Sequence, residues 1–235
     1  MRSKLAPMLI FSLALSLCAA TAEEESRPFN GKDLKGWAFQ KSEKQKPHWK
    51  VGAASLHPED PRMFRVAPDG DQLINDVASQ GQGVDIYSEP EYGDCVITLE
   101  VMVPKGSNSG IYVMGEYEVQ VLDSYGNEKN PGPGDMGAIY GAKPPKDPVY
   151  RKPGEWSSFE IHFQAPRFDA RGKKTQNARF LKVVLNGVAI QEDVEMKGPT
   201  PGGLTGKEHP KGPILFQGNH GPAAYRNIEI HPPTP

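Results

Sequence analysis

Cysteine is almost absent from this chain, as are several features that would assign it to a common class. The 235 residues contain only Cys18 and Cys95. The 27 basic and 29 acidic side chains are interspersed without a basic cluster, which gives no support for nucleic-acid binding. No internal repeat occurs, and no segment shows the 3.6-residue apolar stripe of an amphipathic helix. The sequence must therefore be interpreted from its strand-like segments.

The N-terminal segment has the pattern of an export signal. Arg2 and Lys4 precede an apolar run, Leu5 to Leu17, which the small residues Ala20-Thr21-Ala22 follow. This order predicts a secretory signal peptide, residues 1–22, because the run is too short to span a membrane. We expect cleavage near Ala22 and a periplasmic or secreted mature protein, with a formal net charge of −4 instead of −2.

Cleavage would also remove Cys18, although lipidation of this residue stays open as an alternative despite the bulky Leu17 before it. Cys95 would then be the only thiol, so no internal disulfide could stabilise the mature chain. A hydrophobic core must do so instead. The roughly 210 remaining residues are enough for one such core, and we expect residues 23–235 to form a single domain.

Alternating apolar and polar residues predict strands almost everywhere. "CVITLEVMV" (95–103) and "WSSFEIHF" (156–163) each place their apolar side chains on one face. Asn186-Gly187 divides residues 178–196 into two strand-like runs, which predicts a hairpin with a type I′ turn. Two further strands are expected in 212–219 and 223–232. The pattern favours an all-β fold, namely an antiparallel sandwich or jelly roll.

One long connection stands apart from these strands. Residues 128–155 are too rich in proline and glycine for a core strand, and connections of this length in compact domains are usually functional or disordered. The segment contains Tyr140, Lys143 and Tyr150, which a simple linker does not need. We therefore expect it to line a site.

The stretch "YEVQVLDSYG" (117–126) holds the strongest candidates. In a regular strand Glu118 and Gln120 share the polar face, while Asp123 falls on the core side. A β-bulge near Val121-Leu122 would return Asp123 to the polar face. The spacing is similar to the Glu-x-Asp-x-x-Glu motif of laminarinase-type jelly-roll glucanases. Retaining hydrolysis needs two carboxyl groups about 5 Å apart. The amide in the middle of this motif therefore puts that mechanism in question.

A broader resemblance extends over nearly all of the mature chain. It is carried by "FNGKDLKGW", "SNSGIYVMGEYEVQVLDSYG", "GAIYGAKPP", "KPGEWSSFEIHF", "VVLNGV" and "GPILFQGNHGPAAYRNIEI". These motifs resemble the 3-keto-disaccharide hydrolase family, also described as 3-keto-glucoside-1,2-lyases or 3-keto-2-hydroxyglucal hydratases. The resemblance implies a concanavalin A-like antiparallel jelly-roll sandwich and activity on sugars oxidised at C3, mostly in exported proteins. One departure is Met114, where many relatives carry arginine.

The implied chemistry explains the altered motif, because elimination needs a base and an acid but no carboxylate nucleophile. Glu118 or Asp123 is the expected base, and His220 the acid or base at the leaving group. Gln120 would bind a sugar hydroxyl. The remaining expected substrate contacts are Asn108, Tyr140, Lys143 and Arg226, of which Lys143 or Arg226 would neutralise an enolate.

No cofactor is expected, since no ligand spacing demands a metal, although a divalent cation could stabilise the enolate. The expected partners are an oxidised saccharide and a sugar oxidoreductase, with no nucleic acid and no stable membrane insertion. Two other classes remain open, a non-catalytic carbohydrate-binding module and a conventional glucanase. Glu118 and Gln120 could also be solvated positions, His220 a turn residue, and Arg226 half of a structural ion pair.

Overall fold

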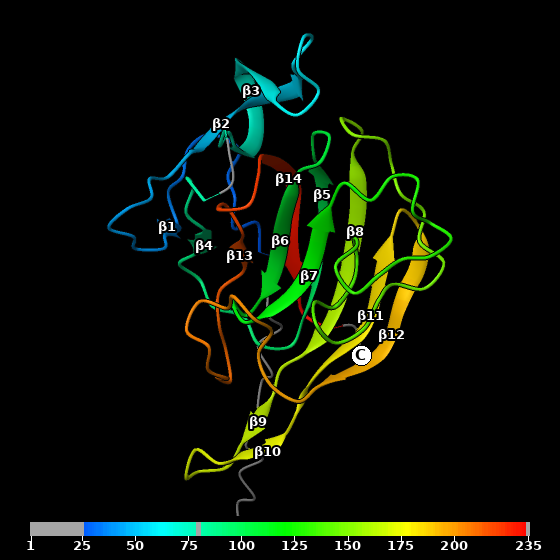
Figure 1. Cartoon of the computed structure of the whole chain (residues 1–235). Helices are drawn as coiled ribbons and strands as arrows, with labels where there is room; N and C mark the ends of the chain where they lie inside the picture. Colours follow the sequence, from blue (N-terminus) through cyan, green and yellow to red (C-terminus); the bar gives the residue numbers. More distant parts are fainter. Residues whose placement is uncertain (1–25, 79–80, 234–235) are drawn as a thin grey trace, which may run out of the picture.

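The computed structural model describes residues 26–78 and 81–233, so the expected signal peptide and Cys18 lie outside the described residues. The described residues contain no helix. Their strands form three antiparallel sheets of seven, five and two strands. The two larger sheets pack face to face (Figure 1). The expected all-β antiparallel sandwich is confirmed.

The seven-stranded sheet provides one layer, and most of its strands begin and end near the positions that alternation predicts. The Asn186-Gly187 hairpin is confirmed, with φ of 52° and 83° at the two turn residues. Across this sheet the order is β12 (Val188–Met196), β11 (Ala178–Leu185), β8 (Ser157–Gln164), β5 (Cys95–Met102), β14 (Ala223–His231), β3 (Phe64–Asn75) and β2 (Trp49–Leu56).

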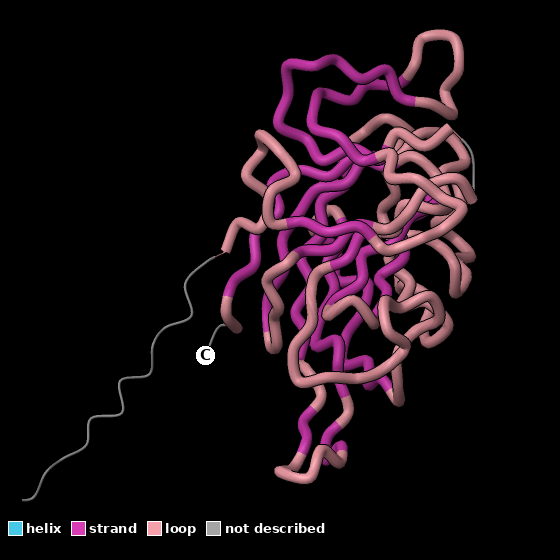
Figure 2. The backbone as a smooth tube through the Cα atoms, turned by 90° about the vertical axis from the view of Figure 1, so that its left-hand side faces the viewer, coloured by secondary structure: helices cyan, strands magenta, loops and turns pink. Residues whose placement is uncertain are grey.

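The five-stranded sheet provides the other layer and is built from shorter strands. Loops gather over its outer face, on the right-hand side of the tube in Figure 2. The order is β1 (Trp37–Phe39), β4 (Ile86–Ser88), β13 (Leu215–Phe216), β6 (Asn108–Val113) and β7 (Tyr117–Leu122), and a separate two-stranded ribbon holds β9 (Arg167–Phe168) and β10 (Lys174–Gln176).

An aromatic stack joins the two layers. Trp37 and Phe216 of the five-stranded sheet lie 5.6 Å apart between ring centroids, and Phe216 stacks on Tyr225 of the other sheet at 4.1 Å. Trp49 extends the stack from Tyr225 at 6.3 Å. Large buried aromatic rings contribute both apolar burial and favourable ring geometry. This stack therefore fixes how the sheets are placed relative to each other.

A β-bulge in β14 changes which residues face the core. The ladder between β14 and β5 shifts between Arg226 and Glu229, and Asn227 has a positive φ of 51°. The bulge lets Tyr225 and Ile228 both enter the core and leaves Arg226 outside it. Simple alternation along 223–232 would place Arg226 on the core face with Ile228 and Ile230, and the bulge overturns that expectation.

Truncating Phe216 tests the aromatic stack. Phe216→Ala should lower the free energy of unfolding by about 3–5 kcal/mol, because it removes a fully buried ring between two others. Leu181→Ala, on an exposed side chain, should change it by no more than about 0.5 kcal/mol. Denaturant unfolding of both variants measures this. Equal effects at the two positions would show that the stack does not join the sheets.

Candidate functional site

The candidate site lies on the outer face of the five-stranded sheet, at the β6–β7 hairpin. Tyr112 pairs with Glu118 and Gly110 pairs with Gln120. Because side chains alternate along a strand, these four positions share the outer face, while the residues between them enter the core. The same hairpin therefore builds the core on one side and a polar surface on the other.

A glycine makes room for the Glu118 carboxyl group. A Cβ at Gly110 would lie 2.4 Å from Oε1 of Glu118 and 2.9 Å from the ring of Tyr112, closer than real Cβ atoms approach other atoms. Any side chain at position 110 would push the carboxyl group away. Gly110, within the "SNSG" segment, thus allows Glu118 to lie against the sheet.

The Glu118 carboxyl group is buried, with only 2% of the residue exposed. The hydroxyl of Tyr112 donates to Oε2 of Glu118 at 2.8 Å. The pKa of Glu118 is raised to about 7, mainly by burial; the hydrogen bond from Tyr112 lowers it and the charge of Asp85 raises it. A carboxyl group with such a pKa accepts and releases a proton readily near neutral pH, which general acid–base chemistry requires.

A pocket of about 200 Å³ opens at this carboxyl group. Its walls come from β6, β7 and three loops. The described residues that line it are Asn108, Tyr112, Glu118, Gln120, Tyr140, Pro201, Gly202, Gln217 and His220.

Two loops form walls of the pocket. The backbone N–H of Tyr140 donates to the carbonyl of Glu118 at 3.1 Å, so the long 128–155 connection runs beside β7 at this point. On another side the hydroxyl of Tyr112 lies 3.3 Å from the carbonyl oxygen of Pro201, and Gly202 follows directly. The expectation that the 128–155 connection lines a site agrees with the position of Tyr140.

Gln120 contributes an amide side chain to the wall of this pocket. Its Nε2 lies 3.4 Å from Oδ1 of Asn108, a long hydrogen bond, while its buried Oε1 has no hydrogen-bond partner among the described residues. Buried polar atoms in proteins are nearly always paired. Protein atoms cover this oxygen, so a ligand would reach it only after the side chain moves.

His220 enters the pocket from the loop after β13, and Asp85 holds this loop in place. The backbone N–H of Gly218 donates to Oδ1 of Asp85 at 2.8 Å, and the carboxylate lies near enough to His220 to interact electrostatically. Burial raises the pKa of Asp85, and the Gly218 hydrogen bond opposes that rise. Asp85 therefore positions the residues that carry His220.

The structure brings Asn108, Gln120, Tyr140, Glu118 and His220 together, but it does not bring Asp123 to them. The β6–β7 ladder runs from Val113–Tyr117 to Asn108–Leu122 without a register shift, so the bulge considered near residue 121 is absent there. Asp123 follows the end of β7, where Oδ2 accepts a hydrogen bond from the Gly106 N–H at 2.8 Å. It stabilises a turn and does not line the pocket.

Two expected substrate contacts also lie elsewhere. Arg226 pairs with Glu100, Nε to Oε2, at 2.9 Å and covers the ring of Trp156 at 4.1 Å from its centroid, on the outer face of the seven-stranded sheet. Lys143 lies in the long connection with its Nζ 3.4 Å from the carbonyl oxygen of Glu192. Neither residue lines the pocket, so neither is placed to neutralise charge at Glu118.

Sequence reasoning missed Tyr112 and Gln217, which line the pocket, and Asp85, which holds the loop that carries His220. Tyr112 belongs to a strand whose alternation could have placed it beside Gly110, on the same face as the polar residues of β7. Asp85 had a weaker signal, as an acidic residue in the apolar run "GVDIYS". Its role depends on contacts with residues more than a hundred positions away.

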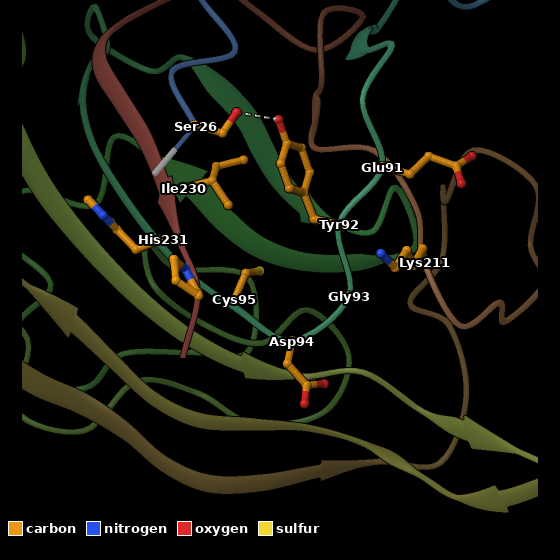
Figure 3. Close-up of a pocket in the computed structure, with 10 residues that line it drawn as sticks. Ser26, Glu91, Tyr92, Gly93, Asp94, Cys95, Lys211, Ile230 and His231 are labelled. Atoms are coloured by element: carbon orange, nitrogen blue, oxygen red, sulfur yellow. Dashed lines mark hydrogen bonds between the residues drawn. The ribbon is translucent and has the colours of Figure 1, made fainter. Parts of the chain in front are cut away.

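A separate hollow of about 240 Å³ lies where the N-terminal segment meets β14 and the start of β5 (Figure 3). Ser26 and Tyr92 join their hydroxyls across it at 3.1 Å, and Ser26 bridges to Ile230. Asp94, at its edge, pairs with Arg167. The buried side chain of Cys95 also lines it. These contacts anchor the N-terminal segment and form no cluster like the one around Glu118.

The described residues include no group of three or more histidine, cysteine or acidic side chains placed to hold a metal ion. They also include no helix long and apolar enough to cross a membrane.

Solved structures define the general class of the protein. A Parabacteroides distasonis protein provisionally named a glycosyl hydrolase is 30% identical, with 90% of this chain and 84% of that chain covered and a TM-score of 0.65. A second protein from that organism, named in the same way, shares the fold at 16% identity, 89% and 94% coverage and a TM-score of 0.59. No curated protein matches the chain. The protein is a carbohydrate-active enzyme.

The family follows from the sequence model that the chain matches. Residues 25–231 match the 3-keto-alpha-glucoside-1,2-lyase-like domain, and the chain belongs to this family. The resemblance that the sequence motifs indicate is therefore confirmed.

Replacing Glu118 should change how stability depends on pH. The folded-state pKa, near 7, exceeds the ordinary value of 4.5, so between these values the folded protein binds more protons than the unfolded one. The free energy of unfolding must then fall as pH rises through this window, by on the order of 3 kcal/mol. We expect Glu118→Gln to abolish this contribution to the loss of stability at higher pH.

Thermal unfolding between about pH 4.5 and pH 7.5 measures the effect, since this range includes both pKa values. The Tm of the wild type should fall more than that of Glu118→Gln, whereas Glu43→Gln, at an exposed position, should follow the wild type. Parallel curves for all three proteins would mean that Glu118 has an ordinary pKa.

Proposed function

We propose that the protein cleaves 3-keto-glycosides by removing the C2 proton and eliminating the group on C1. The observation that carries this proposal is the pocket at Glu118. Glu118 is the one carboxyl residue among the described residues that line it, and Gln120 stands beside it. Retaining hydrolysis needs two carboxyl groups at the scissile bond, whereas elimination needs one base.

The reaction balances without a covalent intermediate. The ketone at C3 acidifies the C2–H bond, and ionised Glu118 takes that proton. The electron pair forms a C1=C2 double bond as the C1–O bond breaks, and the departing oxygen receives a proton. Addition of water then places a hydroxyl on C1 and a proton on C2, which gives the free 3-keto sugar and completes a net hydrolysis.

Neighbouring groups have complementary roles in this proposal. His220 protonates the departing oxygen, since it lines the pocket from the loop after β13, a strand that β6 separates from β7. The hydroxyl of Tyr112, 2.8 Å from Glu118, orients the base. The amide groups of Gln120 and Gln217 bind the sugar oxygens, including the enolate oxygen that forms at C3. Asp85 acts through the loop that carries His220.

The proposal also implies a preceding oxidation and a location. An oxidoreductase that converts a sugar hydroxyl at C3 to a ketone must supply the substrate. We propose that cleavage of the sugar takes place outside the cytoplasm, because residues 1–22 have the pattern of a signal peptide.

Maturation tests the proposed location. When the full chain is expressed in a bacterium, the protein recovered from the periplasm or medium should have Glu23 as its first residue. Intact-mass measurement and N-terminal sequencing give the answer. Retention of residues 1–22 in a cytoplasmic product would contradict export, and a lipid mass on Cys18 would support the lipoprotein alternative.

Turnover in deuterium oxide tests the proposed chemistry. Elimination and hydration of a 3-keto-glucoside should place one deuterium at C2 of the product, whereas direct displacement at C1 leaves the original hydrogen. Mass spectrometry and NMR measure this incorporation. Incubation of free 3-keto-glucose with buffer alone corrects for spontaneous exchange, and the unoxidised glucoside should remain uncleaved.

Single substitutions should show which side chains transfer protons in the reaction. Glu118→Gln and His220→Ala should each lower kcat/KM by about 100-fold or more, because each removes a proton-transfer group. Glu43→Gln is the matched control for the amide substitution and should retain wild-type kcat/KM. Cleavage of the unoxidised glucoside, with Asp123 required, would support a conventional glucanase. Glycan binding without any turnover would support a binding module.

A further inference from the structure

The loop that carries His220 crosses from one sheet to the other. It comprises residues 217–222, between the end of β13 in the five-stranded sheet and the start of β14 in the seven-stranded sheet. His220 lines the pocket and is half-buried, whereas Gly218 and Gly221 on either side of it are buried. Buried carbonyl groups outside a strand ladder need donors from elsewhere in the molecule. The position of His220 therefore depends on what binds the backbone of this loop.

The side chain of Asn75 provides two such donors. Its Nδ2 donates to the carbonyl oxygen of Gly218 at 2.9 Å and to that of Gly221 at 2.8 Å. Because both neighbours are carbonyl oxygens, which only accept, the amide must turn its nitrogen toward them. The two N–H bonds of one side chain thus hold the backbone on both sides of Asn219 and His220.

Asn75 itself is firmly placed in the sheet. It is the last residue of β3, is 0% exposed, and its backbone pairs with Trp49 of β2 and with Ala223 of β14. Groups on strands are positioned more accurately than groups on loops. Asn75 therefore connects the loop to the seven-stranded sheet, although the pocket itself is built on the five-stranded sheet.

Close packing on other sides leaves this loop little freedom. A Cβ at Gly218 would lie 2.1 Å from the carbonyl oxygen of Val84, and a Cβ at Gly221 would lie 2.5 Å from Oγ of Ser107, both closer than real Cβ atoms approach other atoms. The hydroxyl of Ser107 also donates to the carbonyl of Pro222 at 2.6 Å. The contacts of Asn75 therefore complete a set that holds the loop from several directions.

The amide of Asn75 is used for its donors alone. Its Oδ1 is buried and has no hydrogen-bond partner among the described residues. An unpaired buried acceptor is unfavourable. An apolar side chain would avoid that cost, but it would leave the carbonyl groups of Gly218 and Gly221 without these donors. The two hydrogen bonds to the loop therefore account for an amide at this position.

We propose that Asn75 is a positioning residue that fixes His220 where it can protonate the departing oxygen. The inference rests on the proposed function, because that function gives His220 its proton-transfer role. Asn75 does not line the pocket, so it acts through the loop. Loss of its amide should let the loop shift, which moves the imidazole away from the departing oxygen and leaves Glu118 in place.

Leaving groups of different basicity test this inference. Methoxide needs a proton in order to leave, whereas 4-nitrophenolate is stable as an anion, so a methyl 3-keto-glucoside depends more strongly on an acid than its 4-nitrophenyl analogue. Asn75→Ala should lower kcat/KM for the methyl compound about 10- to 100-fold, and for the 4-nitrophenyl compound by no more than about threefold. His220→Ala should show the same preference.

Gln191→Ala is the matched control. Gln191 is likewise a buried amide whose Nε2 donates to two carbonyl groups, those of Gly137 at 3.1 Å and Lys143 at 3.3 Å, and whose Oε1 has no hydrogen-bond partner within the described part of the chain. It holds the 128–155 connection and not the loop after β13. Any loss of kcat/KM in Gln191→Ala should therefore be equal for the two compounds. An equal loss in Asn75→Ala as well would overturn the inference, since a purely structural role predicts it.

A double substitution tests whether Asn75 acts through His220. In the His220→Ala background, Asn75→Ala should lower kcat/KM for the methyl compound little further, because the group that it positions is already gone. A full additional loss would contradict the inference. Asn75→Ser, which keeps a single donor, replaces Asn75→Ala in these measurements if the alanine variant does not fold.

NMR separates this inference from the proposed function. A wild type that cleaves neither compound would disprove the proposed function, and the ring signals of His220 in histidine-labelled protein would still test the positioning. These signals, assigned with His220→Ala, should shift or broaden in Asn75→Ala but not in Gln191→Ala. Unchanged His220 signals in a folded Asn75 variant would overturn the inference.

Discussion

Burial of one carboxyl group is the constraint on which the site depends. Glu118 lies against a strand that must have glycine at position 110, and it is held by the hydroxyl of Tyr112. Removing a carboxylate from water is unfavourable, so its proton affinity rises. The burial that makes Glu118 costly to ionise also makes it a suitable base near neutral pH. In this hairpin, stability and reactivity are set by the same few atoms.

The sandwich supplies the rigidity that this arrangement needs. The inner faces of β6 and β7 pack into the core, and the aromatic stack at Phe216 joins the two sheets. A site on strands is positioned more accurately than a site on loops. His220 is the exception, because it stands on a loop, and the buried carboxylate of Asp85 compensates by holding the backbone of Gly218.

Local pattern was enough to predict much of the fold and part of the site. Alternation placed Glu118 and Gln120 on one face, and Asn186-Gly187 marked the hairpin. Bulges were not predictable in this way. One was considered near residue 121, where the ladder is regular, and another at Asn227 moved Arg226 out of the core face. Asp85 was missed because its role comes from pairing between strands far apart in sequence, which single-sequence periodicity does not show.

The tip of the β6–β7 hairpin also limits where variation is tolerated. Met114 and Gly115 both have positive φ values, 55° and 70°, and Glu116 anchors the neighbouring loop. Insertions here would disturb both the base and the loop that Glu116 holds. Residues 209–213 do not line the Glu118 pocket. Sequence variation, by natural drift or by directed evolution, is therefore less disruptive in that loop than at the hairpin tip, because the reacting groups are left untouched.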